Sequence, residues 1–232
     1  MKPYLTKTPA LIKDLYPKYI WDIQTDTKEL YLTFDDGPHP EITTRVLDLL
    51  DQYQAKATFF CVGDNIRKYP ETFQEILKAG HSTGNHTFNH LNGWTTRTDR
   101  YLANIEKTES IIDELKAENL DSNFTAQNLP SAGGPKTTGL KLFRPPYGKI
   151  RQKQAKYLLS NNFKIIMWDV LSGDFDTRLS PGKCYNNIIE SAQRGSIIVF
   201  HDSEKAFERL KVVLPKTLDF FSRKGYSFNA IM

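Results

Sequence analysis

The sequence predicts an α/β protein with one parallel sheet whose strands are connected by helices. Over residues 29–231, short apolar runs alternate with longer amphipathic segments, which is the pattern of strands joined by helical crossovers. Acidic residues or a histidine directly follow several of the apolar runs. Because the carboxyl ends of parallel strands meet at one face of an α/β barrel, this placement also predicts a single site there.

The predicted strands are short apolar runs broken by turn residues or acids, such as ELYLTF, which is followed by DDGPHP, at residues 29–40. The run FKIIMWDVL at residues 163–171 predicts one buried strand. The complete set of predicted strands covers residues 29–34, 57–62, 81–85, 142–143, 163–171, 196–200 and 226–231.

The predicted helices carry apolar residues three or four positions apart. Residues 98–116 show this most clearly, with Thr98 as the N-cap and Leu102, Ile105 and Ile112 on one face. The complete set of predicted helices covers residues 42–54, 70–79, 98–116, 152–160, 182–193 and 206–223, the last interrupted near Pro215.

We expect a single domain over residues 1–232. Residues 118–141 are polar and rich in Gly, Pro, Ser and Thr, but the alternation of strands and helices resumes after them. This stretch therefore predicts a long loop, either an insertion or a lid, and no domain boundary. Residues 1–28 precede the first predicted strand and are expected to form an N-terminal extension that packs on the barrel.

Composition and charge limit the classes of partner. The formal net charge is +4 and the lysines and arginines are scattered, so we expect no nucleic-acid partner, while a cell-wall polymer is permitted. No stretch approaches the roughly 20 apolar residues that span a bilayer, and the N-terminus lacks the apolar core of a secretory signal. We expect a monomer, cytoplasmic at face value or in the cell envelope if a leader was removed. Cys61 and Cys184 are expected to be buried free thiols.

Two histidines, His86 and His90, lie four residues apart in HTFNH. One helical turn or a tight loop would put both imidazoles on one side. Two histidines at this spacing, with a carboxylate from elsewhere in the chain, form a common zinc shell. Taken alone, the pair fits two solvated histidines equally well.

Two adjacent acids, Asp35 and Asp36, follow the first apolar run. Placing both after a buried strand is unfavourable unless a cation or a hydrogen-bond donor stabilises them. Because consecutive side chains point in different directions, one can bind a metal while the other faces a water on that metal. The alternative is an Asx-type turn before Gly37 and Pro38, which requires only one aspartate.

The segment RPPYG begins at Arg144 and contains two prolines, which stiffen it and remove two backbone donors. The next free N–H is that of Tyr147, and a rigid loop that presents one N–H suits an oxyanion. Arg144 suits bidentate binding of a carboxylate. In isolation, the motif fits an arginine on a surface turn better.

A histidine, His201, ends the apolar run IIVFH and is followed by Asp202. A single histidine at a strand end is more often structural. Its position on the same predicted face as Asp35 and Asp36 favours a functional role.

Six stretches, in order along the chain, resemble the motifs of the NodB-like polysaccharide deacetylases, carbohydrate esterase family 4. They are TFDDGPHP (33–40), ATFFCVGDNI (57–66), HTFNH (86–90), RPPYG (144–148), WDVLSGD (168–174) and IIVFHD (197–202). The resemblance runs from about residue 30 to the C-terminus. It implies a distorted (β/α) barrel with fewer than eight parallel strands and the removal of acetyl groups from N-acetylated or O-acetylated sugars.

The resemblance also implies a divalent metal, zinc above all, with cobalt or nickel as alternatives. By position, Asp36, His86 and His90 match the metal ligands of the family. The expected partner is an acetylated carbohydrate, such as peptidoglycan or a chitin-like polymer.

The remaining roles come from the same resemblance. Asp35 matches the general base, and Arg144 matches the residue that orients it. Tyr147 matches the residue whose N–H binds the oxyanion, and His201 matches the general acid. The positions that match the lining of the acetyl pocket are Trp168, Val199 and Tyr147.

One position departs from the family pattern. The family usually has an Asp three residues after the tryptophan of WDVLSGD, where this chain has Leu171. The carboxylate partner of His201 is therefore open, with Asp169, Asp174 and Asp202 as candidates. We expect His201 to lack one partner, so that its pKa is less raised and the activity optimum lies at lower pH than in relatives with Asp at this position.

Two other functions remain open. A carbohydrate-binding pseudoenzyme on the same fold would have lost the base or the acid, but Asp35 and His201 are both present. A hydrolase of small acetyl-amides would share every motif. A groove with exposed aromatic residues would favour the polymer, and a closed pocket under residues 118–141 would favour a small substrate.

Overall fold

The computed structural model describes residues 4–123 and 141–232. Its strands are β1 (Glu29–Asp35), β2 (Ala57–Cys61), β3 (Ser82–Asn85), β4 (Lys141–Phe143), β5 (Phe163–Ile165), β6 (Val170–Leu171), β7 (Ile197–His201) and β8 (Ser227–Phe228). Within the described residues, seven of them form a parallel sheet in the order β5-β4-β3-β2-β1-β7-β6, and β8 pairs with the start of β1. The sheet curls into a partial barrel, as predicted from the family resemblance.

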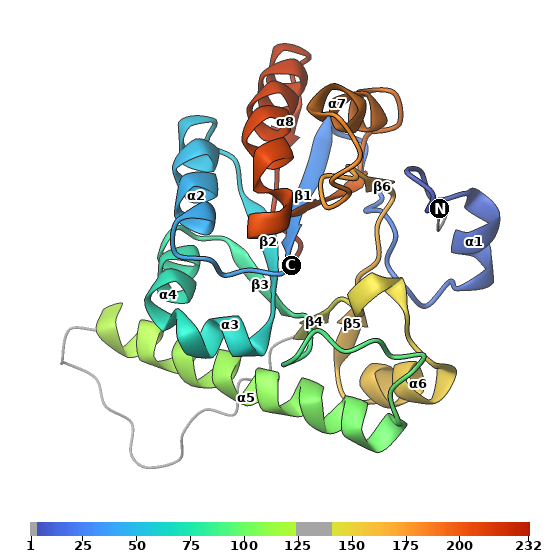
Figure 1. Ribbon diagram of the computed structural model, residues 1–232, viewed down its shortest axis with the longest axis vertical. Helices are drawn as coiled ribbons and strands as arrows, with labels where there is room; N and C mark the ends of the chain where they lie inside the picture. Colours follow the sequence, from blue (N-terminus) through green and yellow to red (C-terminus); the bar gives the residue numbers. More distant parts are fainter. Residues whose placement is uncertain (1–3, 124–140) are drawn as a thin grey trace.

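Helices cover the outside of the curled sheet (Figure 1). They are α1 (Ala10–Leu15), α2 (Ile42–Gln52), α3 (Gly63–Lys68), α4 (Pro70–Lys78), α5 (Thr98–Asn123), α6 (Gln152–Ser160), α7 (Pro181–Ile189) and α8 (Glu204–Arg223). In this view α2, α7 and α8 group at the top, and α5 and α6 lie at the bottom.

The alternation of side chains along β1 separates the core from the site. Leu30, Leu32 and Phe34 belong to the main hydrophobic core, in which they pack with the helices outside the sheet. Burial of each such side chain stabilises the fold by roughly 1.5–3 kcal/mol. Because successive side chains of a strand point to opposite faces, Thr33 and Asp35 point to the other face, into the barrel.

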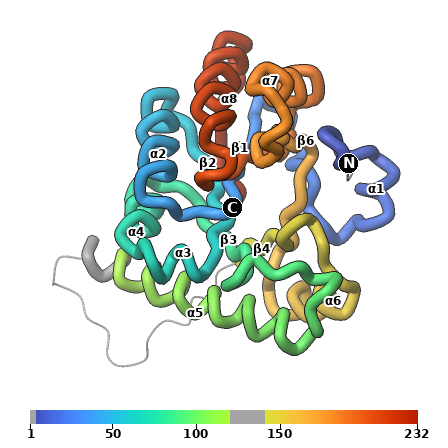
Figure 2. The backbone as a smooth tube through the Cα atoms, viewed as in Figure 1, coloured from blue at the N-terminus to red at the C-terminus, as the bar shows by residue number. Residues whose placement is uncertain are grey.

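The N-terminal segment fills the gap between β5 and β6, two strands that do not pair with each other. Ile20 donates to the carbonyl of Ile165 (2.9 Å) and accepts from the N–H of Met167 (2.7 Å). Further along, Leu171 donates to the carbonyl of Thr6 (2.8 Å). Figure 2 shows this segment running beside β6. The N-terminal segment and residues 165–171 thus share one edge of the barrel.

These contacts correct one prediction. Residues 163–171 form two short strands, β5 and β6, and not one continuous strand. The residues between them bond to other segments, since Ile166 bridges to Ile20 and the N–H of Asp169 donates to the carbonyl of Ile197. The run is buried as expected, but its backbone partners come from distant parts of the chain.

Several helices also differ from the predictions, since α1 was not predicted and α7 ends at Ile189 and not at residue 193. The helix α8 continues through Pro215 without interruption, because the flanking Leu214 and Thr217 are buried and hold the helix in place. The short α3 was not predicted. The helix α5 extends to Asn123, so residues 118–123 are helical and not part of a loop. The rest of the proposed insertion or lid, residues 124–140, lies outside the described residues.

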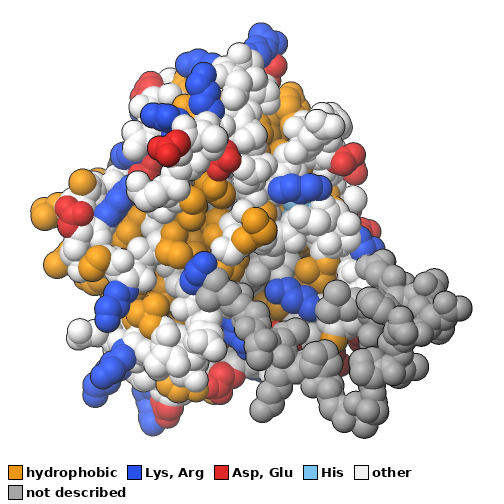
Figure 3. Space-filling model, turned by 180° about the vertical axis from the view of Figure 1, so that it is seen from behind, with side chains coloured by type: hydrophobic (Ala, Val, Ile, Leu, Met, Phe, Trp, Pro, Cys, Tyr) orange, Lys and Arg blue, Asp and Glu red, His pale blue; other side chains and the backbone are white. Residues whose placement is uncertain are grey.

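The surface seen in Figure 3 mixes charges of both signs around a central group of hydrophobic side chains. No single-sign patch suited to nucleic acid is visible on this face. Over the described part of the chain, no helix has the length and apolar character needed to cross a membrane. Cys61 and Cys184 are buried free thiols, as predicted.

Candidate active site

The carboxyl ends of parallel strands bring the predicted site residues together. Asp35 ends β1 and His201 ends β7, and the two are register partners on neighbouring strands. His86 follows β3 and Arg144 follows β4. The N–H of Arg144 donates to the carbonyl of Asn85, the last residue of β3, at 3.0 Å. The four strands therefore present these side chains at one face of the barrel.

Three potential metal ligands, Asp36, His86 and His90, cluster just beyond these strand ends. Their ligand atoms all lie within 4.8 Å of one another. Oδ1 of Asp36 is 3.2 Å from Nε2 of His90 and 3.9 Å from Nε2 of His86. A loop, not a helix, places the two histidines on one side. Two imidazoles and one carboxylate would leave a position open on a four-coordinate cation.

Hydrogen bonds fix how the histidine rings face this cluster. Nδ1 of His86 lies 2.8 Å from the carbonyl oxygen of Arg144. A carbonyl only accepts, so Nδ1 carries the proton and Nε2 presents a lone pair to the cluster. Nδ1 of His90 lies 3.1 Å from the hydroxyl of Tyr147. Burial lowers the pKa of His86 to about 4, so the ring is neutral at pH 7, as metal binding requires.

The carboxylate of the cluster sits on a strained turn. Asp36 has φ 83° and His90 has φ 53°, in the left-handed region that residues other than glycine seldom adopt. Burial raises the pKa of Asp36. The hydrogen bond to His90 and the charges of His201 and His86 lower the pKa by more than burial raises it, so it lies below its ordinary value. An ionised carboxylate held against imidazole nitrogens fits a divalent cation.

Beside the cluster, Arg144 holds Asp35. Arg144 is fully buried, and its Nη1 donates to Oδ1 of Asp35 at 2.7 Å and to Oγ1 of Thr33 at 2.6 Å. Its Nη2 donates to the carbonyl of Met167 at 2.9 Å, and the guanidinium lies 4.2 Å from the ring centre of Phe60. Among the described residues, Oδ2 of Asp35 has no hydrogen-bond partner. One carboxylate oxygen is thus fixed, and the other remains available to a water or a substrate.

On the opposite side, His201 pairs with Asp174. Nδ1 of His201 lies 2.8 Å from Oδ1 of Asp174, and the backbone N–H of His201 donates to Oδ2 of the same carboxylate at 2.9 Å. Burial lowers the pKa of His201, but the Asp174 carboxylate more than offsets this and, with Asp36 and Asp35, raises it to about 9. The ring is therefore protonated at neutral pH and can donate a proton.

The three candidate partners of His201 separate clearly. Asp174 contacts the ring. The buried carboxylate of Asp169 instead accepts hydrogen bonds from Nζ of Lys7, Nζ of Lys13 and Oγ of Ser196, at 2.5–2.6 Å. Asp174, three residues beyond Leu171, thus supplies the carboxylate partner of His201, as one of the three candidates. That the pKa of His201 is less raised than in relatives with Asp at position 171 stays a prediction.

The third candidate, Asp202, holds the turn that carries Asp36. Asp202 is buried, its Oδ1 accepts from the N–H of Gly37 at 3.0 Å, and its Oδ2 accepts from the hydroxyl of Thr43 at 2.5 Å. A Cβ on Gly37 would lie 2.1 Å from Oδ2, so only glycine fits there. Asp202 thereby connects β7, the Asp36–Gly37 turn and the first turn of α2.

The RPPYG segment makes a tight turn, at Pro146–Gly148, above the cluster. Tyr147 has φ 61°, and a hydrogen-bond partner of its N–H is not found in the described parts of the chain. Gly148 has φ 65°, and a Cβ there would lie 2.7 Å from the ring of Trp168. Val199 is buried on the inner face of β7, with Leu171 as a register partner. Tyr147 and Trp168 thus lie close together, while Val199 is nearer to His201.

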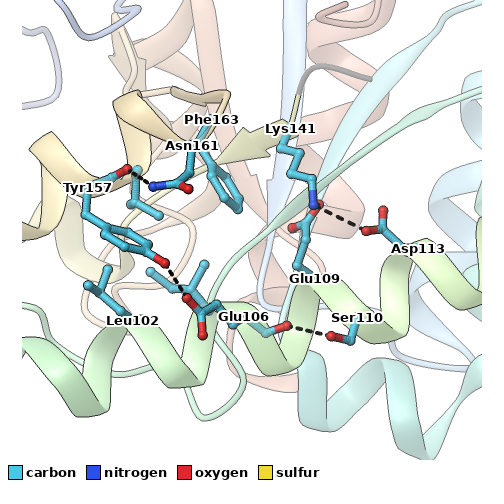
Figure 4. A pocket seen from close by; sticks show the side chains of 11 residues that line it. Leu102, Glu106, Glu109, Ser110, Asp113, Lys141, Tyr157, Asn161 and Phe163 are labelled. Atoms are coloured by element: carbon cyan, nitrogen blue, oxygen red, sulfur yellow. Dashed lines mark hydrogen bonds and ion pairs between the residues drawn. The ribbon is translucent and has the colours of Figure 1, made fainter. Parts of the chain in front are cut away.

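A separate pocket of about 270 Å³ opens between α5 and α6, at the amino ends of β4 and β5 (Figure 4). Residues of the candidate site do not line it. Its charged groups are already paired, since Glu106 accepts from Tyr157 at 2.7 Å and Lys141 pairs with Asp113 at 3.3 Å. This pocket is not part of the candidate site.

Comparison with known proteins assigns the chain to a family. Residues 22–138 match the sequence profile of the family described as polysaccharide deacetylase. A peptidoglycan-N-acetylglucosamine deacetylase of Bacillus cereus is 37% identical over 175 residues, which are 75% of this chain and 56% of that protein. Another protein of that name from the same organism is 31% identical over 222 residues and 94% of each chain. The chain belongs to the polysaccharide deacetylase family.

Solved structures agree with this assignment. The crystal structure of a peptidoglycan N-acetylglucosamine deacetylase has a TM-score of 0.74 at 31% identity and covers 97% of this chain and 95% of its own. The structure of the peptidoglycan deacetylase PdaC from Bacillus subtilis has a TM-score of 0.70 at 26% identity and covers 90% of each chain. As a polysaccharide deacetylase, the protein is a hydrolase of that family's type.

Two threonines around the site of this polysaccharide deacetylase were not predicted from the sequence. Thr33 accepts from Arg144, and Thr43 bonds Asp202, as described above. Phe175 packs edge-on against the ring of His201, with the ring centres 5.0 Å apart. Only Phe175 carried a sequence signal, since it follows Asp174 directly. The two threonines act through partners more than 100 residues away.

Proposed function

We propose that this polysaccharide deacetylase is a metal-dependent hydrolase that removes acetyl groups from N-acetylated sugars of a polysaccharide. One observation carries the proposal, namely that the Asp36, His86 and His90 cluster lies between a held carboxylate, Asp35, and a protonated imidazole, His201. Hydrolysis of an amide needs a base for the water and an acid for the leaving nitrogen, and both stand beside the cluster.

Asp36, His86 and His90 would hold the cation. Nitrogen and carboxylate ligands suit zinc, and also cobalt or nickel. When bound, such a cation supplies an acidified water and polarises the acetyl carbonyl.

The protein's own groups account for the proton transfers. Asp35 accepts the proton of the attacking water through its free oxygen, while Arg144 holds the carboxylate in place. The N–H of Tyr147 donates to the carbonyl oxygen as it becomes negative. His201, held by Asp174, donates its proton to the leaving nitrogen, because an amine leaves far more readily than its anion.

The names of the relatives favour peptidoglycan as the polymer. Both proteins of Bacillus cereus are peptidoglycan-N-acetylglucosamine deacetylases, and a protein of Bacillus subtilis, 30% identical over 78% of this chain, is a peptidoglycan-N-acetylmuramic acid deacetylase. A chitooligosaccharide deacetylase of Azorhizobium caulinodans is 27% identical over the same share. We therefore propose N-acetylated sugars of peptidoglycan as the first substrates to test and chitooligosaccharides as the second.

Acetate release tests the proposal. The substrates are peptidoglycan, chitooligosaccharides, acetylated xylan and small acetylated amides, each with metal-loaded protein and with chelator-treated protein. We expect release from the N-acetylated glycans that disappears with the chelator and returns with zinc. Activity that survives full metal removal, or that persists in Asp35→Asn, would contradict the mechanism. Release from small amides alone would favour the small-substrate alternative.

A further inference from the structure

A strip of surface continues outward from the metal cluster. The ring of Tyr147 lies edge-on to the ring of His90, with centres 4.7 Å apart. Nζ of Lys149 lies 6.0 Å from the ring centre of Tyr147 and 5.3 Å from that of Trp94. Tyr147, Lys149 and Trp94, which we call the aromatic–lysine strip, therefore form a continuous row that starts at a ligand of the cluster.

Trp94 is exposed and yet fixed in place. The exposed fraction of Trp94 is 58%. The indole N–H donates to the carbonyl of Ile150 at 3.2 Å, and Nε of Arg151 donates to the carbonyl of Trp94 at 3.1 Å. Behind it, a Cβ on Gly93 would lie 2.4 Å from the carbonyl oxygen of Lys149, so the two loops are in close contact. An exposed ring that is already ordered loses little entropy when a ligand stacks on it.

Lys149 holds a charge that the protein does not neutralise. Within residues 4–123 and 141–232, its ammonium group takes part in no ion pair and no hydrogen bond, and its contacts are with the faces of Trp94 and Tyr147. A cation over aromatic faces is attracted to them but remains able to bind an anion. The strip therefore offers two rings for stacking and one positive charge between them.

We propose that the aromatic–lysine strip is a subsite for a sugar ring that carries a carboxylate, next to the sugar that is deacetylated. The inference rests on the proposed function for its place along the glycan. The aromatic rings would accept the apolar face of any sugar, whereas Lys149 favours a sugar with an acidic substituent. Muramic acid, with its ether-linked carboxylate, has this chemistry, and a chitooligosaccharide does not.

Binding of two matched ligands tests the subsite independently of turnover. One ligand is a short chitooligosaccharide, and the other is a peptidoglycan oligosaccharide of equal length with muramic acid at alternate positions. Binding to the zinc-loaded protein is measured by calorimetry at low salt. We expect Lys149→Gln to lower the affinity for the carboxylate-bearing ligand about fivefold, as for the loss of one partly exposed ion pair. The affinity for the neutral ligand should not change.

Two further variants serve as controls. Lys153→Gln removes a neighbouring exposed lysine of α6 and is expected to change neither affinity. Trp94→Ala is expected to weaken both ligands, since stacking does not depend on charge. The preference that depends on Lys149 should shrink as salt is raised, because salt screens exposed charges.

The outcomes separate the subsite from the activity. Equal losses for the two ligands in Lys149→Gln, or no loss for either, would overturn the subsite. If the wild type releases no acetate but Lys149→Gln still weakens only the carboxylate-bearing ligand, the subsite stands and the proposed function falls. If acetate is released and Lys149→Gln changes neither affinity, the proposed function stands without the subsite.

Discussion

Asp174 contacts His201 twice, with Oδ1 2.8 Å from Nδ1 of the imidazole and Oδ2 2.9 Å from the backbone nitrogen. The carboxylate thus fixes both the position of the strand end and the orientation of the ring. Because Nδ1 faces Asp174, the proton that His201 can donate is the one on Nε2, which faces the site.

The first prediction concerns pH. With a pKa of about 9, against an ordinary 6.5, His201 stays protonated across neutral pH. We expect activity to fall as the pH rises through about 9. Asp174→Asn removes the charge that raises the pKa, so the falling limb of the pH–rate profile should move toward lower pH.

The same shift affects stability. Because the folded-state pKa is the higher one, the charged ring stabilises the fold below about pH 6.5, and this contribution is lost as the pH rises through about 9. Asp174→Asn should therefore lose stability mainly below about pH 8. An unchanged falling limb together with an unchanged pH dependence of unfolding would contradict the assigned partner.

The second prediction concerns the buried pair of Arg144 and Asp35. Arg144→Met leaves a buried carboxylate without its partner, which costs roughly 3–5 kcal/mol of unfolding free energy. Arg223→Met removes an exposed arginine paired with Asp219 at 2.9 Å and is expected to cost less than about 1 kcal/mol. Urea unfolding of both variants measures the difference, and equal losses would show that burial of the pair does not matter.

The third prediction concerns Asp202. Burial raises its pKa from 3.8 to about 7, so its contribution to stability is greatest below pH 3.8 and is lost as the pH rises toward 7. Asp202→Asn keeps an acceptor for Gly37 and a donor for Thr43 but carries no titrating proton. We expect it to be at least as stable as the wild type at about pH 8.

Asp202→Ala is the matched variant that removes both hydrogen bonds. It leaves buried partners unsatisfied, which costs roughly 1–3 kcal/mol for each such group. Because the turn that carries Asp36 then loses its support, we also expect weaker zinc binding in Asp202→Ala than in Asp202→Asn. Equal zinc affinities in the two variants would contradict a positioning role.

The fourth prediction concerns the metal. His86→Gln removes a ligand nitrogen that faces the cluster, so the purified protein should retain much less zinc and release no acetate. His39→Gln is the control, since Nδ1 of His39 only accepts from backbone N–H groups at the start of α2, at 3.3 Å. Zinc content is measured by atomic absorption. Full zinc content in His86→Gln would contradict the assigned ligand set.

Much of the fold was predictable from local pattern. The runs that form β1, β2 and β7 are apolar and short, and the helix α6 has the predicted bounds, 152–160. The division of residues 163–171 was not predictable, because it depends on hydrogen bonds to Ile20 and Thr8, more than 140 residues away. A sequence window contains no trace of a partner at that distance.

The site shows the same limit. The metal cluster follows from two motifs that each carry their own signal. The partner of His201 could not be predicted in this way, because three aspartates lie within the neighbouring motifs. The folded loop decides which of them faces the ring. The aromatic–lysine strip was also invisible in the sequence, since Trp94 and Lys149 belong to different loops.

The N-terminal segment at the edge of the barrel has a consequence for how the chain is made. Residues 6–23 are synthesised well before their backbone partners at 165–171 and 195–196, which lie more than 140 residues further along the chain. The segment must therefore remain unpaired until these partners have been made, so that it docks after β1, β2, β3 and β4 have been synthesised.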